Sequence, residues 1–460
     1  MGVPHSGEPV DQFKFRQYTW DEVRKHNTRE SCWIVIAGSV YNVTEWLSRH
    51  PGGEVVVLSC AGLDCTDIFN AFHSPAIRGR MLLSFKVGIV SDYAVPRVTA
   101  EFRTFAESVE NSPLMKVSTT FYVKLVVWYS ILLGASISSI LLFPDNPWMC
   151  AVLSGCMMGL YFQQVAFLGH DLGHTAVFHN RIRDTGAGLF FGNIMTGISL
   201  GWWKSSHNAH HVTTNSVTAD PDIQHLPIFA VSNKFFGSIF STYHEKTLSF
   251  NGFAKFMVPL QSKLYYVAMA LARCNLYAQS IIFLLRGDSY VKRRIGTNRR
   301  MEILGLTFFA AWYSYLVSCI PCWSWRLIFF LISHCLAGIL HVQITLSHFD
   351  MPVYLDTHPL ESDSFLEHQL KTCLDIDCHT SLDWFHGGLQ FQAAHHLFPR
   401  IPRCNLRNLR ELLRVFCAQH NLDYASADFL QANLRMISHL REVGEECRQA
   451  AFSDILNLKG

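Results

Sequence analysis

The chain has 460 residues, of which 49% are hydrophobic and 16% are charged, and its formal net charge is +2. This length allows two or three domains, the apolar composition favours a membrane protein over a soluble one, and the nearly balanced charge argues against nucleic-acid binding. Residues 1–17 are polar and charged, so they lack the apolar core of a secretory signal. Fourteen cysteines without a regular disulfide framework indicate reduced thiols.

The N-terminal part of the chain has the pattern of a small haem-binding domain. Short β-rich runs, Trp33-Ile-Val-Ile and Val40-Tyr-Asn-Val-Thr, precede the tight turn of His50-Pro-Gly-Gly, and a second histidine, His73, follows. Two imidazoles on opposite faces of a haem leave no coordination position for oxygen, which suits electron transfer. We therefore predict that His50 and His73 are the axial ligands of a haem b.

Residues 91–120, with Pro96, Pro113 and scattered charges, are predicted to be a linker. Hydrophobic runs of about 20 residues, enough to cross a bilayer, follow at 123–143, 148–168, 303–321 and 327–346. The connectors within these pairs of runs contain no lysine or arginine, whereas arginines precede the third run, so the positive-inside rule predicts a cytosolic haem domain and cytosolic histidine motifs. Apolar runs at 185–201 and 264–285 are interrupted by polar residues and are predicted to be interfacial or buried helices.

Three histidine-rich motifs lie in this apolar part of the chain. They are His170-x-x-x-His174, His207-x-x-His210-His211 and Gln392-x-x-His395-His396. On a helix, residues three and four apart share one face, so each motif directs its imidazoles towards a common point. Imidazoles with open coordination positions suit non-haem iron, and a set this large suits two metal ions in one cavity. One such motif is a weak signal in a chain with 23 histidines, but the repetition strengthens it.

Other residues are candidates for the support of this metal site. His348, just after the fourth hydrophobic run, is predicted to be an additional ligand, while His225 is either a ligand or an interfacial histidine with an ordinary hydrogen bond. Gln392 either binds a metal through its amide oxygen or orients a ligand. The side chains that could fix the tautomer of a ligand histidine are Asp171, Asn208, Asp220 and Asp222.

These motifs carry a resemblance to a known family. Residues 14–90 resemble a cytochrome b5 domain, and 160–410 resemble a membrane fatty-acyl or sphingolipid desaturase, the combination found in front-end desaturases. In that family a glutamine replaces the first histidine of the third motif, as Gln392 does here. The stretches most similar to sphingolipid 8-desaturases, in particular the fungal type, are 197–204, 220–227, 342–349 and 375–378.

The resemblance implies a fold and an order of domains. A small α+β haem domain (14–90) and the linker (91–120) would precede an all-α membrane domain (121–425) with about four transmembrane helices and a cytosolic helical cap, and a cytosolic tail would follow (426–460). The spacing of leucines within 401–460 predicts amphipathic helices in that region. These leucines are Leu406, Leu409, Leu412 and Leu413.

The resemblance also implies a reaction, its cofactors and its partners. The expected reaction introduces a double bond at carbon 8 of the sphingoid base of a ceramide, with O2, two non-haem irons and electrons from the fused haem. Those electrons would come from NADH through a cytochrome b5 reductase, and the expected location is the endoplasmic reticulum membrane. The iron ligands carried over from the motifs are His170, His174, His207, His210, His211, His395 and His396.

Related activities stay open at this point. An acyl-lipid front-end 6-desaturase shares the three motifs and the haem fusion, and a haem-fused lipid hydroxylase uses similar histidine clusters but adds oxygen to carbon. In a different class, a membrane electron carrier could bind haem in the same way and hold structural zinc at the histidines. Iron analysis separates this last case, because two irons beyond the haem would exclude it.

Overall fold

The computed structural model of the protein describes residues 15–75, 77, 82–286, 296–355 and 364–457. Its N-terminal body contains a four-stranded sheet in the order β1-β4-β3-β2, in which β1 and β4 are parallel and the other pairs are antiparallel. The β2–β3 hairpin turns at Ala37 and Gly38, which both have positive φ, as a tight two-residue turn requires. The strands are β1 (Arg16–Tyr18), β2 (Trp33–Ile36), β3 (Ser39–Asn42) and β4 (Lys86–Val90).

Short helices in this body position the two candidate haem ligands. The helices are α1 (Trp20–Arg24), η1 (Thr44–Arg49), α2 (Glu54–Leu58), α3 (Thr66–Phe72) and η2 (Leu82–Phe85). The first of them, α1, begins at a capping box formed by Thr19 and Glu22. His50 directly follows η1, and His73 directly follows α3. Both histidines therefore lie at the ends of elements that the small fold holds in place.

Helix α5 (Arg97–Glu110) lies within the segment that the sequence predicted only as a linker. Its Phe102 and Val109 are buried. The ring of Phe102 lies 6.0 Å from that of Phe398 and 6.1 Å from that of Phe416, centroid to centroid. The segment is therefore more than a tether, because it packs between the haem domain and the C-terminal helices.

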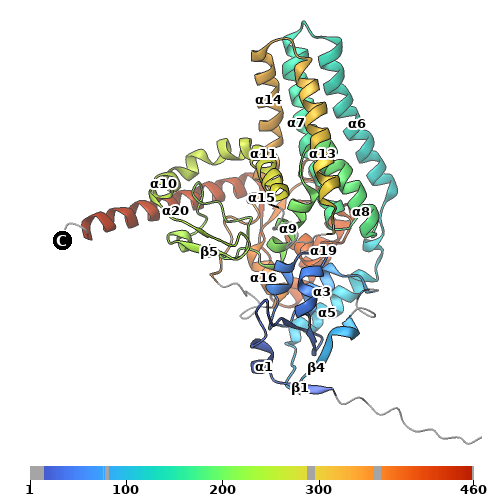
Figure 1. The fold of residues 1–460 in the computed structure, drawn as a ribbon, viewed down its shortest axis with the longest axis vertical. Helices are drawn as coiled ribbons and strands as arrows, with labels where there is room; N and C mark the ends of the chain where they lie inside the picture. The colour runs from blue at the N-terminus through green and yellow to red at the C-terminus, as the bar shows by residue number, and fades with distance from the viewer. Residues whose placement is uncertain (1–14, 76, 78–81, 287–295, 356–363, 458–460) are drawn as a thin grey trace, which may run out of the picture.

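Four long helices run side by side at one end of the molecule (Figure 1). They are α6 (Thr119–Leu142), α7 (Ser154–Gly173), α13 (Arg299–Ser318) and α14 (Trp323–Ala337). Outward-facing side chains such as Val127, Phe308 and Leu327 are apolar and exposed, as expected for helices that face lipid. The α6–α7 and α13–α14 connections lie at the end of this bundle that is remote from the haem domain (Figure 1).

Within the residues that the structure describes, four segments are long and apolar enough to cross a membrane: Pro113–Leu142, Trp148–Gly173, Gly252–Leu285 and Trp323–Thr345. Their number agrees with the sequence prediction, and they include the predicted first, second and fourth runs. The other one ends with α11 (Gln261–Leu285), which the sequence assigned to an interfacial or buried helix. The predicted third run corresponds to α13, which lies in the bundle but is not among these four segments. Helix α11 is inclined away from the bundle towards α10 (Gly252–Met257) (Figure 1).

Helices α7 and α14 approach each other closely at a glycine. A Cβ atom on Gly159 of α7 would lie 2.7 Å from Cβ of Leu336 and 2.8 Å from the carbonyl oxygen of Ser333. Small residues of this kind permit close helix packing within a membrane. The contact fixes α7, whose C-terminal end carries the first histidine motif.

Helix α9 (Leu200–Val212) carries the second histidine motif and begins at a buried polar anchor. The buried carboxylate of Glu302 accepts hydrogen bonds from the Ser199 hydroxyl and from the Gly201 amide, the latter over 3.0 Å. A carboxylate at this position stabilises a helix N-terminus. The start of α9 is therefore tied to α13. Between α7 and α9 lie α8 (Arg181–Gly188) and the π-helical η5 (Leu189–Ile194).

Further helices and strands complete the chain, and some of them pack around the third histidine motif. They are β5 (Ile239–Ser241), β6 (Lys246–Leu248), α15 (Ile339–Thr345), α16 (Phe365–Thr372), β7 (Asp375–Asp377), α17 (Asp383–His386), α18 (Gln392–Leu397), α19 (Leu406–Gln419), β8 (Ser426–Asp428) and α20 (Phe429–Asn457). Strand β7 pairs in parallel with β8. The buried carboxylate of Asp375 accepts hydrogen bonds from the Ala393 amide of α18 (3.0 Å) and from the Tyr424 hydroxyl (2.5 Å). The C-terminal strand thus helps to hold α18.

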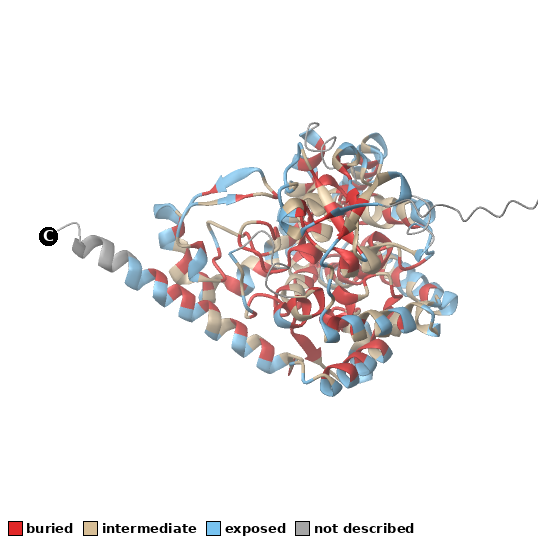
Figure 2. Cartoon of the chain, turned by 90° about the horizontal axis from the view of Figure 1, so that it is seen from below, coloured by how far each residue is buried: buried red, intermediate tan, exposed pale blue. Residues whose placement is uncertain are grey.

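Helix α20 occupies most of the segment that the sequence set apart as a tail. Its Ala432, Met436 and Leu440 are buried in a cluster that includes Tyr265 of α11. Seen from below, one face of this helix is buried and the other is exposed (Figure 2). The amphipathic helices predicted between 401 and 460 correspond to α19 and α20.

Candidate metal centre

The two predicted haem ligands face each other. The ring centroids of His50 and His73 are 6.0 Å apart, which leaves room for one metal ion with two metal–nitrogen bonds of about 2 Å. Nδ1 of His50 lies 2.9 Å from the carbonyl oxygen of Gly53, and Nδ1 of His73 lies 3.0 Å from that of Phe69. Because a carbonyl only accepts, each Nδ1 carries the proton, and each Nε2 is left to bind metal. The pair therefore fits a haem with two histidine ligands.

The glycine after Pro51 is explained by this arrangement. A Cβ atom on Gly52 would lie 2.7 Å from Cε1 of His50. Any larger residue would therefore push the imidazole out of its position. The His-Pro-Gly-Gly motif is thus needed for ligand geometry as well as for a turn.

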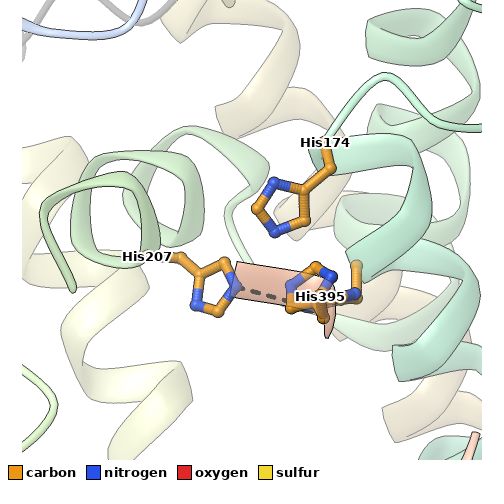
Figure 3. Close-up of side chains that lie close together, drawn as sticks. His174, His207 and His395 are labelled. Atoms are coloured by element: carbon orange, nitrogen blue, oxygen red, sulfur yellow. Dashed lines mark hydrogen bonds between the residues drawn. The ribbon is translucent and has the colours of Figure 1, made fainter. Parts of the chain in front are cut away.

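The histidines of the three motifs meet below the helix bundle in two groups. In the first group, the ligand atoms of His170, His174, His207 and His395 all lie within 4.8 Å of one another, and the second group is formed in the same way by His210, His348 and His396. Figure 3 shows His174, His207 and His395, which come from different segments, converging on one point. His211 lies between the groups, because its ring stacks on that of His396 at 4.1 Å and its Nε2 is 3.0 Å from Nε2 of His207.

The spacing of the ring nitrogens fits metal coordination. Nε2 of His207 lies 3.2 Å from Nε2 of His170 and 3.0 Å from Nε2 of His211. Ligands bound at about 2 Å to one ion come within roughly 3 Å of each other. Nε2 of His174 and Nε2 of His395 are buried and have no hydrogen-bond partner. Buried polar atoms without a partner are costly, so these nitrogens indicate that a metal completes the site.

Burial determines the charge of most of these imidazoles. It holds the pKa of His174, His207 and His395 well below the ordinary value, and neighbouring histidines add to this effect. Neutral imidazole is the form that binds metal. For His210, burial also disfavours the charged form, but Asp220 and Asp222 outweigh it and raise the pKa to about 9. The two groups therefore differ in charge environment, since the carboxylate of Asp220 lies within hydrogen-bond distance of His210 in the second group.

Polar side chains and carbonyls orient the second group. Nδ1 of His210 lies 2.9 Å from the carboxylate of Asp220, which fixes the tautomer and leaves Nε2 for a metal. Two contacts of this kind were not foreseen from the sequence. Nδ1 of His396 lies 2.8 Å from Oε1 of Gln369, and Nδ1 of His348 lies 3.0 Å from the carbonyl oxygen of Thr372. Both partners belong to α16, which carries no histidine motif to draw attention to it.

Two of the candidate support residues, Asp171 and Asn208, do not act as predicted. Asp171 lies 3.8 Å from Nδ1 of His170, too far for a hydrogen bond, and its carboxylate instead pairs with Arg403 and accepts from the Tyr122 hydroxyl, both at 3.1 Å. The amide of Asn208 reaches the haem domain, where it donates to Gly52. His225 lies outside both histidine groups.

The support roles of Asp222 and Gln392 remain predictions. The carboxylate of Asp222 lies 3.9 Å from Nδ1 of His210 and 4.0 Å from Nδ1 of His207, so it is close to both groups. Gln392 is buried on the same helix as His395. Its role as ligand or as orienting residue stays a prediction.

We expect the Gln369→Ala variant to bind iron about 10–100-fold more weakly, the range found when a residue that orients a metal ligand is removed. The amide oxygen that accepts from His396 would be lost, and so would the amide group that donates to the carbonyl of His211 over 3.0 Å. Iron content at a fixed concentration of competing chelator measures this change. In the matched Gln369→Glu variant the acceptor is kept, so iron binding should fall less; equal losses in both variants would contradict the role given to the oxygen.

Comparison with known proteins agrees with both parts of this arrangement. Residues 19–91 match the cytochrome b5-like heme/steroid binding domain, and residues 146–427 match the fatty acid desaturase family. A solved structure, cytochrome b5 of Ostreococcus tauri virus 2, is 35% identical, covers 16% of this chain and 95% of its own, and has a TM-score of 0.16. The cytochrome b5-like domain implies a haem, with which the facing histidine pair is compatible. The desaturase domain implies a di-iron centre, with which the two histidine groups are compatible.

Relatives from plants and yeast extend over nearly the whole chain. The Delta(8)-fatty-acid desaturase of Helianthus annuus is 41% identical over 94% of this chain and 92% of its own. The Delta 8-(E)-sphingolipid desaturase of Komagataella phaffii is 33% identical over 93% of each chain, and the acyl-lipid (9-3)-desaturase of Borago officinalis is 38% identical over 94% of each. Since the family match spans more than half of the chain and sits on the histidine groups, the protein belongs to the fatty acid desaturase family, as a membrane oxidoreductase with a fused cytochrome b5-like domain.

Proposed function

We propose that the protein introduces a double bond at carbon 8 of the sphingoid base of a ceramide, and that its own haem domain supplies the electrons. The single observation that carries this proposal is the position of the two histidine groups directly beside the haem-ligand pair in one chain. The choice of lipid is supported by relatives named as Delta(8) desaturases, in plants and in yeast. The reaction would consume O2.

The proposed roles of the histidines follow the geometry. His50 and His73 would bind the haem iron. Gln392 would act as a ligand or hold one in place. The proposed ligands of the two non-haem irons are His170, His174, His207, His210, His211, His348, His395 and His396.

When bound, the two irons supply the activation of O2 that removal of hydrogen from an unactivated methylene carbon requires. The protein's own residues keep buried ligands of the first group neutral and dry, and they orient the ligands of the second group. Burial of His174 and His395 excludes water and keeps the pKa of both imidazoles low. Asp220, Gln369 and the carbonyl of Thr372 fix the orientation of the second group. Such preorganisation reduces the reorganisation needed during the reaction.

The proposed setting is the endoplasmic reticulum membrane, with the haem domain and the histidine groups on the cytosolic side. Two observations support this orientation. The connections at the far end of the bundle, 143–147 and 319–322, contain no lysine or arginine, as the positive-inside rule expects for the lumenal side. The haem domain and all three histidine motifs lie at the opposite end (Figure 1). The proposed electron donor to the haem is an NADH-dependent cytochrome b5 reductase.

An acyl-lipid substrate is the second candidate, because the (9-3)-desaturase of Borago officinalis is as similar in sequence as several Delta(8) relatives. That enzyme's printed name refers to an acyl lipid. The histidine groups and the haem pair would serve either substrate equally. Only the position of the new double bond distinguishes the two candidates.

We expect expression in a yeast host that lacks sphingoid-base 8-desaturation to produce a new double bond at carbon 8 of the sphingoid base. Mass spectrometry that maps double bonds in both sphingoid bases and fatty acids makes this measurement. The control is the same host with the His395→Ala variant, which keeps the haem domain. A new bond in an acyl chain would assign the acyl-lipid function instead, and a new hydroxyl group would identify a hydroxylase.

A further inference from the structure

The haem domain and the histidine groups meet on helix α9. Both loops that carry the haem-ligand histidines contact this helix. Nδ2 of Asn208 donates to the carbonyl oxygen of Gly52 over 3.5 Å, and the ring of Phe72 lies edge-on to that of His211, with centroids 5.8 Å apart and an interplanar angle of 87°. Asn208 and His211 are three residues apart and share a face of the helix. One face of α9 therefore receives the haem domain next to the second histidine motif.

Phe72 links the haem side of this contact to the metal side. It directly precedes His73, one of the facing pair. On the other side, His211 stacks on His396 and lies 3.0 Å from Nε2 of His207, so it touches both histidine groups. The ring of Phe72 therefore lies between His73, one of the haem-ligand histidines, and His211, the histidine that joins the two groups.

The backbone next to Phe72 is held from the membrane domain. Nε of Arg400 donates to the carbonyl oxygen of Ala71 over 3.2 Å, and the same guanidinium pairs with Glu110 of α5 at 2.5 Å. At a second point of the interface, Arg29 pairs with Glu245 at 3.1 Å. These contacts hold the haem domain against the rest of the chain, so the Phe72–His211 contact belongs to a docked interface rather than to an isolated ring pair.

We propose that Phe72 is the positioning residue of the electron path from the haem to the histidine-bound irons. This inference rests on the proposed relay from haem to metal and adds its route. An edge-on ring in contact with His211 bridges the space between the two centres and keeps water out of it. Each electron transferred would oxidise one haem iron from Fe2+ to Fe3+. For one double bond, two such electrons, two protons and one O2 would accompany the removal of two hydrogens from the lipid and yield two waters.

The test is the rate at which reduced haem is reoxidised, followed by its absorbance in stopped flow. The iron-loaded enzyme is used without lipid, so that the result is independent of which lipid is the substrate. Three variants are compared with the unchanged enzyme: Phe72→Leu, Phe72→Tyr, which keeps the ring, and Phe105→Leu. The last is the matched control, because Phe105 also packs at the domain interface, 6.0 Å from Phe398, but contacts no haem ligand or motif histidine among its aromatic neighbours.

We expect haem reoxidation to slow by up to about 100-fold in Phe72→Leu, because misplacement of positioned groups can cost this much, and to stay near the original rate in Phe72→Tyr and Phe105→Leu. Unchanged reoxidation in Phe72→Leu, or an equal loss in Phe105→Leu, would overturn the proposal. An unchanged haem spectrum and an unchanged haem reduction potential in Phe72→Leu separate a lost path from lost structure.

This design also separates the route from the proposed function. If the enzyme makes no 8-unsaturated sphingoid base in yeast while Phe72→Leu still slows haem reoxidation, the substrate assignment fails and the route stands. If the double bond forms and Phe72→Leu reoxidises normally, the function stands and electrons take another path.

Discussion

We expect the His395→Ala variant to lose desaturase activity by more than about 100-fold, beyond the loss typical of residues that only orient a ligand, while its haem spectrum stays unchanged. Nε2 of His395 is buried without a partner among four converging histidines. Removal of this imidazole would leave the first group with three of its four histidines. The haem-ligand pair lies in the N-terminal domain, on segments separate from the helix that carries His395. Product analysis, iron content and the absorbance spectrum together make the measurement.

Two further variants control this experiment. His379 is exposed, and its Nδ1 interacts locally with Ser381, so His379→Ala should keep both iron and activity. In the reciprocal variant, His50→Ala, the haem spectrum should disappear while non-haem iron is kept. Product from His395→Ala would contradict its assignment as a ligand. Loss of haem in the same variant would point to misfolding instead.

We expect the Arg403→Met variant to destabilise the membrane domain by about 3–5 kcal/mol, the cost of leaving one partner of a buried ion pair without the other. The guanidinium of Arg403 lies 3.1 Å from the carboxylate of Asp171, and their side chains are only 7% and 5% exposed. Asp171 follows His170 of the first motif, and Arg403 follows the third motif by a few residues. The pair therefore links two of the three motif segments. Thermal unfolding of the detergent-solubilised protein, followed by tryptophan fluorescence, measures the effect.

The matched control is the Arg407→Met variant, one turn further along. Arg407 pairs with Asp383, but these side chains are 25% and 39% exposed. Exposed pairs of this kind contribute about 0–1 kcal/mol, so stability should change little. If both variants destabilise the protein equally, burial is not the reason for the importance of Arg403.

The sequence predicted the parts of the metal site that depend on local spacing. Motif residues on α7, α9 and α18 share helix faces because they lie three or four positions apart. His348 was found by its position just after a hydrophobic run, and it joins the second group. Gln369 could not be found in this way, since it lies 27 residues from His396 and no motif surrounds it. Its contact depends on how α16 packs, which is a property of the whole fold.

Adjacency in the sequence was a poor guide to side-chain direction. Asp171 and Asn208 are next to motif histidines, and for that reason they were expected to support them. Both side chains point elsewhere, Asp171 to Arg403 and Asn208 to the haem domain. On a helix, successive residues differ in direction by about 100°, so immediate neighbours seldom share a partner. Asp220, which is ten positions from His210, makes the contact instead.

The pairing of β7 with β8 sets the order in which the centre can be completed as the chain is made. Domains generally fold as units during synthesis, N-terminal parts first. The haem domain can therefore fold while the ribosome is still adding the membrane helices. Helix α18 is different, because its position depends on residues near the C-terminus. Asp375 accepts a hydrogen bond from the first turn of α18 and another from the Tyr424 hydroxyl, and its strand pairs with residues 426–428. Iron loading consequently belongs to the last stage of biogenesis, and a nascent chain interrupted before residue 428 would carry haem without a finished di-iron site.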